Sequence, residues 1–599
     1  MASHFAFLQK YATTMGVFQR WFDSFKPAER GIGKEPNYMG ELPSEHHSHI
    51  DAKEKDKDTL GKDEFTNTTV AVKTEDGGVA LIPEETGLKR SLEGRHIQLI
   101  AIGGSIGTGL FVGSGITLAT GGPGSLMLAF IIVAVLVIST IFSLGELAAV
   151  LPISGSFSTY SVRFIDPSWG FAMGWNYWLQ WLTTFPLEAT AATIVISFWD
   201  KDEVVPRGVW VTIFILTISF IHIFGARGYG EFEFIAASLK VIGCIGFIIC
   251  AIVIDVGGSP AKTYFGAHAW HENPAFLNGF KGFCSVFITA CFAYSGTEIV
   301  GIAAAETSSP RKHIPKAAKQ VIMRVLIFYI VSLLMVTLLV PASNKHLEGD
   351  SNDPSNSPFV LAIQTGQIHA LPQIFNAGIL ISAFSVGNAS VYGGCRTLLS
   401  LAELGMAPKI FTYVDRQGRP LPAMGVSLLF GLLGYLIYAS DPNTIFNWLV
   451  SISGLSVIFS WASTCVAHIR FRKAWLRQGN KLEQLPWVSP LGIPGSIFSV
   501  VLNILVLMAA FYNAAWPIGE GTMTAGDRVN YFFESMLSLP IILLTFILHK
   551  IIRRTRHVRI DEIDVQTGRR DPVSEEVLEQ ERAEWRAKPV YAKIWNTFF

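Results

Sequence analysis

Residues 103–115 read GGSIGTGLFVGSG and lie inside an apolar stretch that is long enough to cross a membrane. Each glycine costs about 0.8–1 kcal/mol relative to alanine in a helix interior. No water replaces lost backbone hydrogen bonds inside a bilayer, so irregular backbone is tolerated there only where it lines a cavity. The stretch therefore predicts a broken membrane helix. Close helix packing is the alternative, because Gly103/Gly107 and Gly109/Gly113 are also small-xxx-small pairs.

The composition places the chain among membrane proteins. Half of the residues are hydrophobic and only 16% are charged, whereas a soluble domain usually carries about 25% charged residues. Long apolar runs with short polar connections fill residues 96–550, and both flanks are polar. We expect a cytoplasmic N-terminal tail at 1–95, a transmembrane domain at 96–550 and a cytoplasmic C-terminal tail at 551–599.

Runs of about 20 apolar residues predict about twelve transmembrane helices and an all-α integral membrane fold. The expected spans lie at 97–119, 126–152, 171–199, 209–225, 231–255, 281–304, 317–341, 370–400, 421–440, 444–468, 494–514 and 530–550. Lys and Arg gather in one set of connections, such as Arg311 and Lys312 or Arg470 and Arg472. Because basic connections face the cytoplasm and the span number is even, both termini are predicted to be cytoplasmic.

The N-terminal tail contains a periodic apolar pattern over residues 5–26. Its apolar residues recur at three- and four-residue intervals: Leu8, Tyr11, Met15, Phe18, Phe22 and Phe25. This spacing is typical of an amphipathic helix that lies on the inner leaflet or docks on the protein. The alternative is a helix that forms only transiently in a disordered tail. The charged run that follows, DAKEKDKDTLGKDEF, predicts disorder for most of the tail.

A second break is expected in the sixth span. Transporters built from inverted repeats carry broken helices at corresponding positions of their two halves. If the glycine-rich helix opens one five-helix repeat, its counterpart is the sixth span, which reads CFAYSGTEIVG at 291–301. Ser295 and Gly296 interrupt the apolar run there, and Glu298 follows immediately. Two breaks at symmetric positions favour a binding site over simple close packing.

Ionisable residues inside the spans are the next candidates, because a charge at the bilayer centre costs at least ~2.5–3.5 kcal/mol. Glu146 ends the second span, where a structural ion pair explains it well. Glu188 lies in the third span, Lys240 in the fifth and Glu298 in the sixth. Lys240 has apolar residues on both sides, so a snorkelling side chain explains it poorly.

Several long motifs, in this order, resemble the fungal amino-acid permeases of the amino acid–polyamine–organocation superfamily. They are GSIGTGLFVGSG, PLEATAA, YGEFEF, FAYSGTEIVG and SVGNASVYGGCRTLLSLAELGMAPKIFTYVDRQGRPLP, and the resemblance runs from about Gly94 to the C-terminus. DVQTGRRD and KPVYAKIWNTFF near the end are most similar to the general amino-acid permeases. The resemblance implies a LeuT-type fold, with a 5+5 inverted repeat, two peripheral helices, and discontinuous first and sixth helices.

The resemblance also implies where an amino acid binds. Its carboxylate is expected on backbone N–H groups of the first break, at Ser105, Ile106, Gly107, Thr108 and Gly109. Its ammonium is expected against carbonyls of the second break, beside Gly296, at Ala293, Tyr294 and Ser295. Phe292 is either an aromatic lid over the substrate or a packing residue.

Lys240 carries the implied coupling. In sodium-driven members of the fold a cation bridges the first and eighth helices, and in proton-driven relatives a lysine of the fifth helix reaches that place. Lys240 stands at the matching position, which implies coupling to protons. Glu188 and Glu298 are the candidate partners, either as proton acceptors or as determinants of substrate charge.

The function expected from these residues is amino-acid import by proton symport with alternating access and broad specificity. The alternatives are a permease restricted to one amino-acid class and a non-transporting sensor of the same fold. No nucleophile elbow, HExxH or GxxxxGK[ST] motif points to an enzyme. No cofactor, metal or nucleic acid is expected. The partners are amino acids, protons, membrane lipids and ubiquitin-ligase adaptors on the tails, and the location is the plasma membrane.

Overall fold

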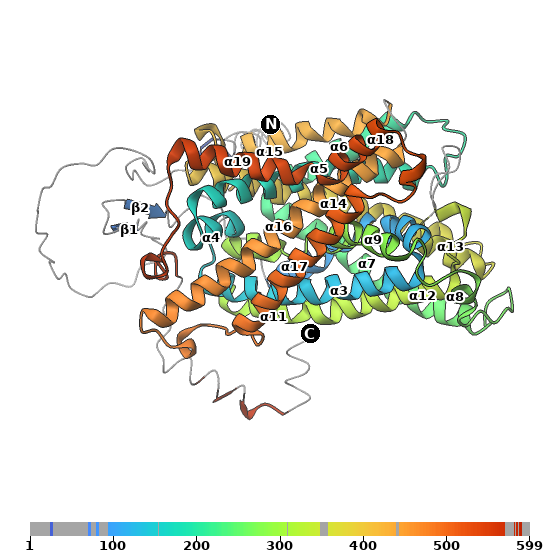
Figure 1. Cartoon of the computed structure of the whole chain (residues 1–599), viewed down its shortest axis with the longest axis horizontal. Coiled ribbons are helices and arrows are strands. Elements are labelled where there is room, and N and C mark those ends of the chain that lie inside the picture. The colour runs from blue at the N-terminus through green and yellow to red at the C-terminus, as the bar shows by residue number, and fades with distance from the viewer. Residues whose placement is uncertain are drawn as a thin grey trace, which may run out of the picture.

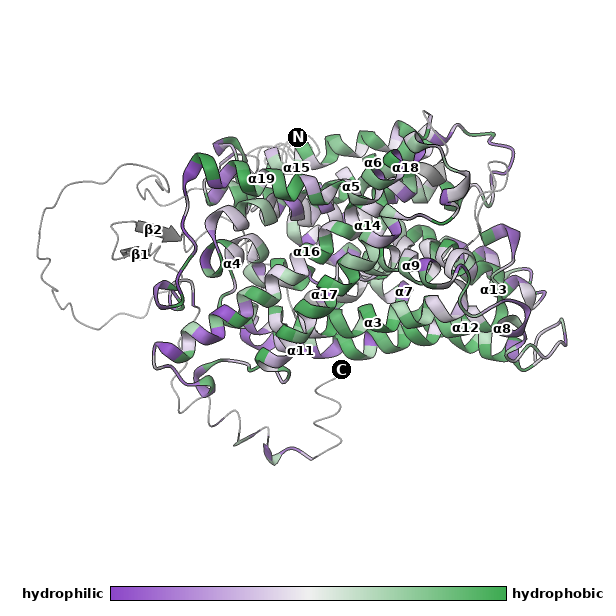
Figure 2. Cartoon of the chain, viewed as in Figure 1, coloured by the Kyte–Doolittle hydropathy of each residue, from purple (hydrophilic) through white to green (hydrophobic). Residues whose placement is uncertain are grey.

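The computed structural model is a bundle of long helices that run in roughly one direction (Figure 1). It describes residues 24, 26–27, 70–73, 79–82, 94–153, 155–307, 309–347, 357–438, 442–569, 580, 583–584 and 586–589. Hydrophobic residues cover the middle of the bundle, whereas hydrophilic residues gather at its two ends (Figure 2). This distribution is that of a multi-pass membrane protein.

The first half of the bundle is built from helices that coincide with the expected spans. They are α2 (Gly94–Gly103), η1 (Gly109–Gly113), α3 (Ser114–Val150), α4 (Ser156–Phe164), α5 (Pro167–Ile196), α6 (Arg207–Ile223), α7 (Gly225–Asp255), α8 (His268–Glu272), α9 (Gly279–Tyr294), α10 (Ile299–Ala303) and η2 (Ala304–Glu306). The first and sixth spans are both interrupted, at residues 104–107 and 295–298. The predicted discontinuity of these two helices is confirmed.

The second half repeats the alternation of long helices and short connections. Its helices are α11 (Pro310–Arg324), η3 (Val325–Val331), α12 (Ser332–Leu339), η4 (Lys345–Leu347), α13 (Pro358–Thr365), α14 (Leu371–Glu403), η5 (Lys409–Thr412), α15 (Leu421–Phe430), η6 (Gly431–Tyr438), α16 (Pro442–Arg477), η7 (Leu482–Gln484), α17 (Gly492–Ala515), η8 (Glu520–Thr522), α18 (Ala525–Met536), α19 (Ser538–Arg553) and η9 (Ile560–Glu562). Several helices outrun their expected spans at the basic end, because charged turns extend them beyond the apolar core.

Not every expected span is a separate, membrane-length apolar helix. Within the described residues eight helices are long and apolar enough to cross a membrane, or nine if the bent pair α18 and α19 counts as one. The outer half of the first span and the second span share the label α3, but they are two helices that meet at a kink, where Gly122 has a non-helical φ of 81° and Pro123 follows. Helices lie at each of the expected ranges, and twelve spans remains a prediction.

The kink in α3 is joined to the chain just before α9. The amide of Gly124 donates to the carbonyl of Ala275 at 2.7 Å, and the amide of Leu277 donates to the carbonyl of Gly121 at 2.9 Å. Helices α3 and α9 also pack along each other. The outer halves of the two broken spans are therefore held together by backbone hydrogen bonds as well as by side-chain packing.

Little of the N-terminal tail belongs to the described residues. Two short antiparallel strands, β1 (Val70–Lys73) and β2 (Val79–Ile82), form a hairpin. The predicted amphipathic helix at 5–26 lies outside the described residues, apart from Ser24 and Lys26. Just beyond it, Pro27 pairs with Asp415 in the connection between α14 and α15. One segment of the tail thus contacts the basic end of the bundle.

The C-terminal strap, which we define as residues 554–569, also docks on the basic end. Arg163 of α4 pairs with Asp564 at 2.9 Å and donates to the carbonyl of Thr567 at 2.7 Å. The amide of Val558 donates to the carbonyl of Ile165 at 3.2 Å. Ile563 of the strap is almost fully buried. The strap thereby ties α4 to the end of α16, where Gln478 donates to the carbonyl of Ile563.

The strap's attachment is expected to depend on pH through Asp564. Burial raises the pKa of this carboxyl, but Arg163 and the hydrogen bonds from Thr567 and Gln566 outweigh burial and hold the pKa below its usual value of 3.8. A depressed pKa stabilises the docked state above the usual pKa, and that stability is lost as the pH falls through the lower folded value. The melting temperature of the purified protein should therefore exceed that of Asp564→Asn by a constant margin from pH 8 to about 5. A margin that does not shrink below about pH 4 would contradict this assignment.

Candidate functional site

The two breaks touch each other in the middle of the bundle. Gly296 has φ 84°, and a Cβ built on it would lie 2.1 Å from the carbonyl oxygen of Gly104. Only glycine fits this position, because any side chain would collide with the backbone of the first break. The two halves of the expected repeat therefore meet backbone to backbone.

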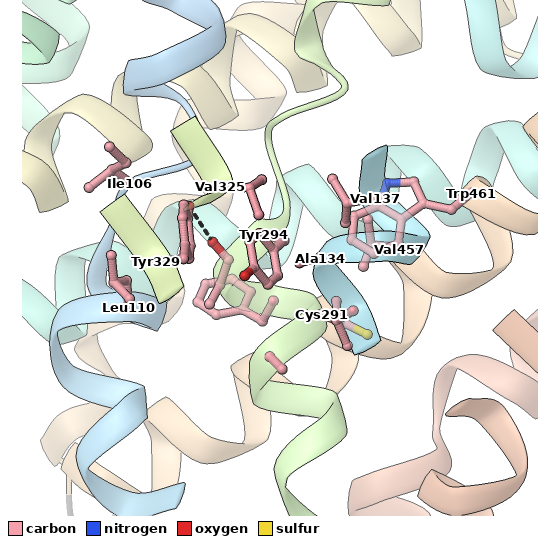
Figure 3. Close-up of a cluster of buried hydrophobic side chains, with 14 of the residues drawn as sticks. Ile106, Leu110, Ala134, Val137, Cys291, Tyr294, Val325, Tyr329, Val457 and Trp461 are labelled. Carbon is pink, nitrogen blue, oxygen red and sulfur yellow. Dashed lines mark hydrogen bonds between the residues drawn. The ribbon is translucent and has the colours of Figure 1, made fainter. Parts of the chain in front are cut away.

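Tyr329 joins the breaks from the seventh span. Its hydroxyl lies 2.7 Å from the carbonyl oxygen of Ser105 and 2.9 Å from that of Ala293. Its ring stacks on Tyr294 with the centroids 4.3 Å apart. Figure 3 shows Tyr329 beside Tyr294, with Ile106 and Leu110 of the first break on its other side. Because a phenol has one proton to donate, the hydroxyl serves only one of the two carbonyls at a time.

Tyr329→Phe removes this link without changing the shape of the ring. We expect it to weaken amino-acid binding by roughly fivefold, because a neutral hydrogen bond contributes about 1 kcal/mol. The measurement is the KM for amino-acid uptake at one fixed external pH, with surface expression quantified in parallel. An unchanged KM would show that the hydroxyl does not hold the two breaks in their binding geometry.

The first break offers unpaired backbone donors where a carboxylate is expected. Within the described residues the amides of Ile106 and Gly107 donate to no backbone carbonyl. The second break offers an acceptor, since no backbone amide of the described segments donates to the carbonyl of Ser295. The carbonyl of Ala293 already accepts a hydrogen bond from the Tyr329 hydroxyl, and the hydroxyl of Thr297 donates to the carbonyl of Tyr294 at 2.7 Å. Buried backbone groups are rarely left unpaired, so these groups suit a ligand with one anionic and one cationic end.

The other residues expected at the breaks have partners inside the protein. Thr108 donates through its hydroxyl to Glu188 at 2.8 Å. Phe292 is buried and packs against Gly109, where a Cβ would lie 2.7 Å from its ring. The packing interpretation of Phe292 agrees with this contact. Ser105 offers its carbonyl to Tyr329.

Lys240 lies where the first, fifth and eighth helices meet. Its ammonium donates to the carbonyl of Gly103 at 2.6 Å, at the end of α2, and to the hydroxyl of Ser385 on α14 at 2.7 Å. The side chain is only 4% exposed. A positive charge thus bridges the first break and the eighth helix, which is the arrangement expected from the resemblance.

Glu233 completes this cluster and is absent from the residues expected from the sequence. Its Oε1 accepts from the Ser385 hydroxyl at 2.5 Å, and its Oε2 has no hydrogen-bond partner. A Cβ at Gly103 would lie 1.9 Å from the Glu233 carboxylate, so this glycine is required for the carboxylate to reach the break. Glu233 precedes Lys240 by two turns of α7, and the filter for ionisable residues within spans could have found it.

The two other acids expected near Lys240 lie in different surroundings. Glu188 of α5 accepts from Thr108 at the first break, and its Oε2 has no partner. Glu298 lies at the second break and accepts from Gln180 at 3.3 Å and from Trp461 at 3.4 Å. No hydrogen bond or ion pair within the described part of the chain joins Glu298 to Lys240. Glu188 and Glu298 therefore serve different breaks.

Two buried ion pairs connect elements around the site. Glu146 pairs with Arg472 of α16 at 2.5 Å, which agrees with a structural role for this acid. Glu306, at the end of the sixth span, pairs with Arg396 of α14 through both carboxylate oxygens. Arg396 and Glu306 were not among the expected site residues, although Arg396 falls within the span expected at 370–400.

The comparisons with known proteins agree with this geometry. A protein-family model for amino acid permeases matches residues 96–562. The chain is 46% identical to the general amino-acid permease GAP1 of Saccharomyces cerevisiae, over 86% of this chain and 87% of the relative. It is likewise 46% identical to the general amino-acid permease GAP2 of Candida albicans, over 87% and 88% of the two chains.

Solved structures share the architecture at much lower identity. A manganese transporter of Eremococcus coleocola superposes with a TM-score of 0.51 at 14% identity, covering 77% of this chain and 94% of that protein. At this identity the likeness concerns the fold alone. It supports the LeuT-type arrangement that the resemblance to the fungal amino-acid permeases implies.

Proposed function

Because this chain belongs to the amino acid permease family and carries amino acids across a membrane, we propose that it imports them by proton symport with alternating access. Broad specificity is part of the proposal, since its relatives GAP1 and GAP2 are named general amino-acid permeases. The observation that carries the coupling is the ammonium of Lys240 held between Gly103 and Ser385.

The charges at this place favour a proton as the coupling ion. Lys240 is hydrogen-bonded to Ser385, Ser385 to Glu233, and Glu188 lies across the first break. With all three groups ionised, the buried cluster carries one net negative charge, which is costly in a low-dielectric interior. Binding one proton makes the cluster neutral. We propose that Glu188 or Glu233 carries that proton and that Lys240 holds the first break against the eighth helix.

The substrate is proposed to lie across the two breaks. Its carboxylate accepts from the amides of Ile106 and Gly107, which donate to no backbone carbonyl of the described residues. Its ammonium donates to the carbonyl of Ser295 and competes with Tyr329 for that of Ala293. Glu298, which is tied to Gln180 and Trp461, holds the second break in shape and sets the charge that a substrate side chain meets.

The proposed setting is the plasma membrane with both tails in the cytoplasm. The basic connections face the side on which the C-terminal strap docks, which fits this orientation. Lipids around the bundle and ubiquitin-ligase adaptors on the tails are the proposed partners.

Uptake in yeast cells that lack their own amino-acid permeases tests the proposal. Radiolabelled neutral, basic, acidic and imino acids are supplied at pH 4.5 and 7, with and without an uncoupler. Broad uptake that rises at acid pH and collapses with the uncoupler supports a general proton symporter. Uptake of one class alone restricts the specificity. No uptake by protein shown to be at the surface favours a sensor.

Glu233→Gln separates proton coupling from substrate binding. Since the amide cannot take up the coupling proton, we expect uptake at pH 4.5 to lose most of its advantage over uptake at pH 7. Exchange of labelled for unlabelled amino acid across the membrane needs no net proton movement and should fall less than about threefold. Glu231→Gln, at a half-exposed position on the same helix, is the matched control. A pH profile like that of the unaltered protein would remove Glu233 from the coupling.

A further inference from the structure

Arg324 is a buried cation without a hydrogen-bond or ion-pair partner among the described residues, and the function proposed above gives it no role. It lies midway along the 30-residue span formed by α11, η3 and α12. Its side chain is 4% exposed, and both terminal nitrogens of the guanidinium, Nη1 and Nη2, lack a hydrogen-bond partner. By contrast, the buried Arg396 and Arg472 each pair with a carboxylate.

An unpaired guanidinium at this depth demands an anion. Arginine stays protonated in proteins, so it cannot escape burial by losing its charge. Removing a partner from a buried ion pair costs about 3–5 kcal/mol, because it leaves an uncompensated charge. Intramembrane ionisable residues almost always pair with one another or line a route for substrate. No carboxylate of the described residues pairs with Arg324, which leaves its guanidinium available to an anionic ligand.

The backbone turns Arg324 toward the same side of the span as Tyr329. The segment η3 (Val325–Val331), which begins directly after Arg324, is a π-helix. A π-helix has wider turns, so two residues that are five positions apart, such as Arg324 and Tyr329, lie near the same face. In an α-helix the directions of two such residues would differ by more than a third of a turn. Tyr329 on that face reaches Ser105 and Ala293, one carbonyl from each break. Helix α11 also packs against α2, the inner half of the first span.

Arg324 therefore lies beside the binding site and on its inner side. The chain of the seventh span runs from the basic connection at Pro310 toward Leu339, so Arg324 comes before Tyr329 on the way from the cytoplasm. The difference is five residues, or roughly 7 Å of helix. A ligand that leaves the two breaks for the cytoplasm passes this level of the bundle.

We propose that Arg324 forms an anion subsite on the inner side of the breaks, which takes a small monovalent anion. The planar guanidinium offers two parallel N–H donors that match a carboxylate. The α-carboxylate of the amino acid in transit and free chloride share this chemistry. The first source makes Arg324 a waypoint for release of the substrate, and it rests on the function proposed above. The second makes it a chloride site.

Anion binding is testable without transport. The purified full-length protein is melted in sorbitol, which supplies no anion, and in sodium chloride or sodium acetate, of which acetate probes a carboxylate. We expect chloride or acetate to raise the melting temperature by about 3 °C in the unaltered protein and not in Arg324→Gln. Lys312→Gln, at an exposed position on the same helix, should behave like the unaltered protein. Equal melting in all three media would overturn the proposal, whether or not the protein transports.

Exchange in proteoliposomes distinguishes the two sources. If the substrate carboxylate is the ligand, Arg324→Gln should slow amino-acid exchange at least tenfold, and replacing internal chloride by gluconate should change nothing in the unaltered protein. If chloride is the ligand, that replacement alone should slow exchange, and Arg324→Gln should be insensitive to it. Arg324→Lys keeps the positive charge but lacks the two parallel N–H donors of the guanidinium. This variant replaces Arg324→Gln in the test if the glutamine variant does not fold. Exchange by Arg324→Gln in chloride at the rate of the unaltered protein in chloride would also overturn the proposal.

Discussion

Lys240→Met should reduce proton-driven amino-acid uptake by about 100-fold, because it removes two charge-assisted hydrogen bonds, each of which contributes about 1.5–3 kcal/mol. Those bonds join the carbonyl of Gly103 to Ser385 of the eighth helix. Methionine keeps the length of the side chain but supplies no donor and no charge. The Glu233 carboxylate, which shares Ser385 with the ammonium, is then left without a nearby cation.

Initial rates of uptake at pH 4.5, normalised to surface protein, measure this effect. Cys244→Ala is the matched control, since Cys244 is also fully buried one turn further along α7. Ser385→Ala removes one of the two links and should have an intermediate effect. If Lys240→Met retains uptake within twofold and remains sensitive to an uncoupler, Lys240 does not take part in the coupling.

Arg396→Leu is expected to cause the largest loss of stability, about 3–5 kcal/mol, since it strands a buried carboxylate. Glu306 and Arg396 are 1% and 5% exposed, and Glu306 also accepts from Tyr392 at 3.0 Å. The pair joins the inner end of the sixth span to α14. Thermal unfolding of the purified protein in detergent measures the loss, as a lowered melting temperature.

The double variant Glu306→Leu/Arg396→Leu tells pairing apart from packing. Replacing both members of a buried ion pair by apolar residues is often neutral or stabilising. The double variant should therefore melt at a higher temperature than Arg396→Leu alone. If it melts at a lower temperature than either single variant, the two side chains act independently through their packing.

The breaks could be predicted from the sequence because glycine and polar residues are costly in a membrane helix. The stretch from Gly103 to Gly115 and the Ser295-Gly296 pair each violate a strong local preference, so their positions are visible without a structure. The contacts of the turn between the first and second spans are less visible in the sequence. Gly122-Pro123 interrupts the helix there, as this pair normally does, but only the structure shows that backbone bonds to Ala275 and from Leu277 hold the turn.

The partners of each charged side chain could not be predicted in the same way. Lys240 stood out because it is isolated among apolar residues, but its bond to Ser385 depends on how α7 and α14 pack. The motif YGEFEF contains two acids, Glu231 and Glu233. The sequence does not show which of them is buried, and the structure shows that it is Glu233. Arg324 follows a basic segment and resembles its continuation in the sequence. The span expected at 317–341 contains Arg324, but only the structure shows that this side chain is buried.

The backbone bonds between the kink of α3 and the start of α9 constrain how the proposed carrier can open. Two backbone hydrogen bonds, from Gly124 to Ala275 and from Leu277 to Gly121, join the two outer half-helices. Neither outer half can swing away alone without breaking hydrogen bonds that lipid cannot replace. To open an outer gate, the outer halves of the first and sixth spans would therefore have to move together, along with the start of the second span. The short inner helices α2 and α10 are not joined by these bonds and can move separately. We therefore expect the inner gate of the proposed carrier to open by movement of single helices more easily than the outer gate does.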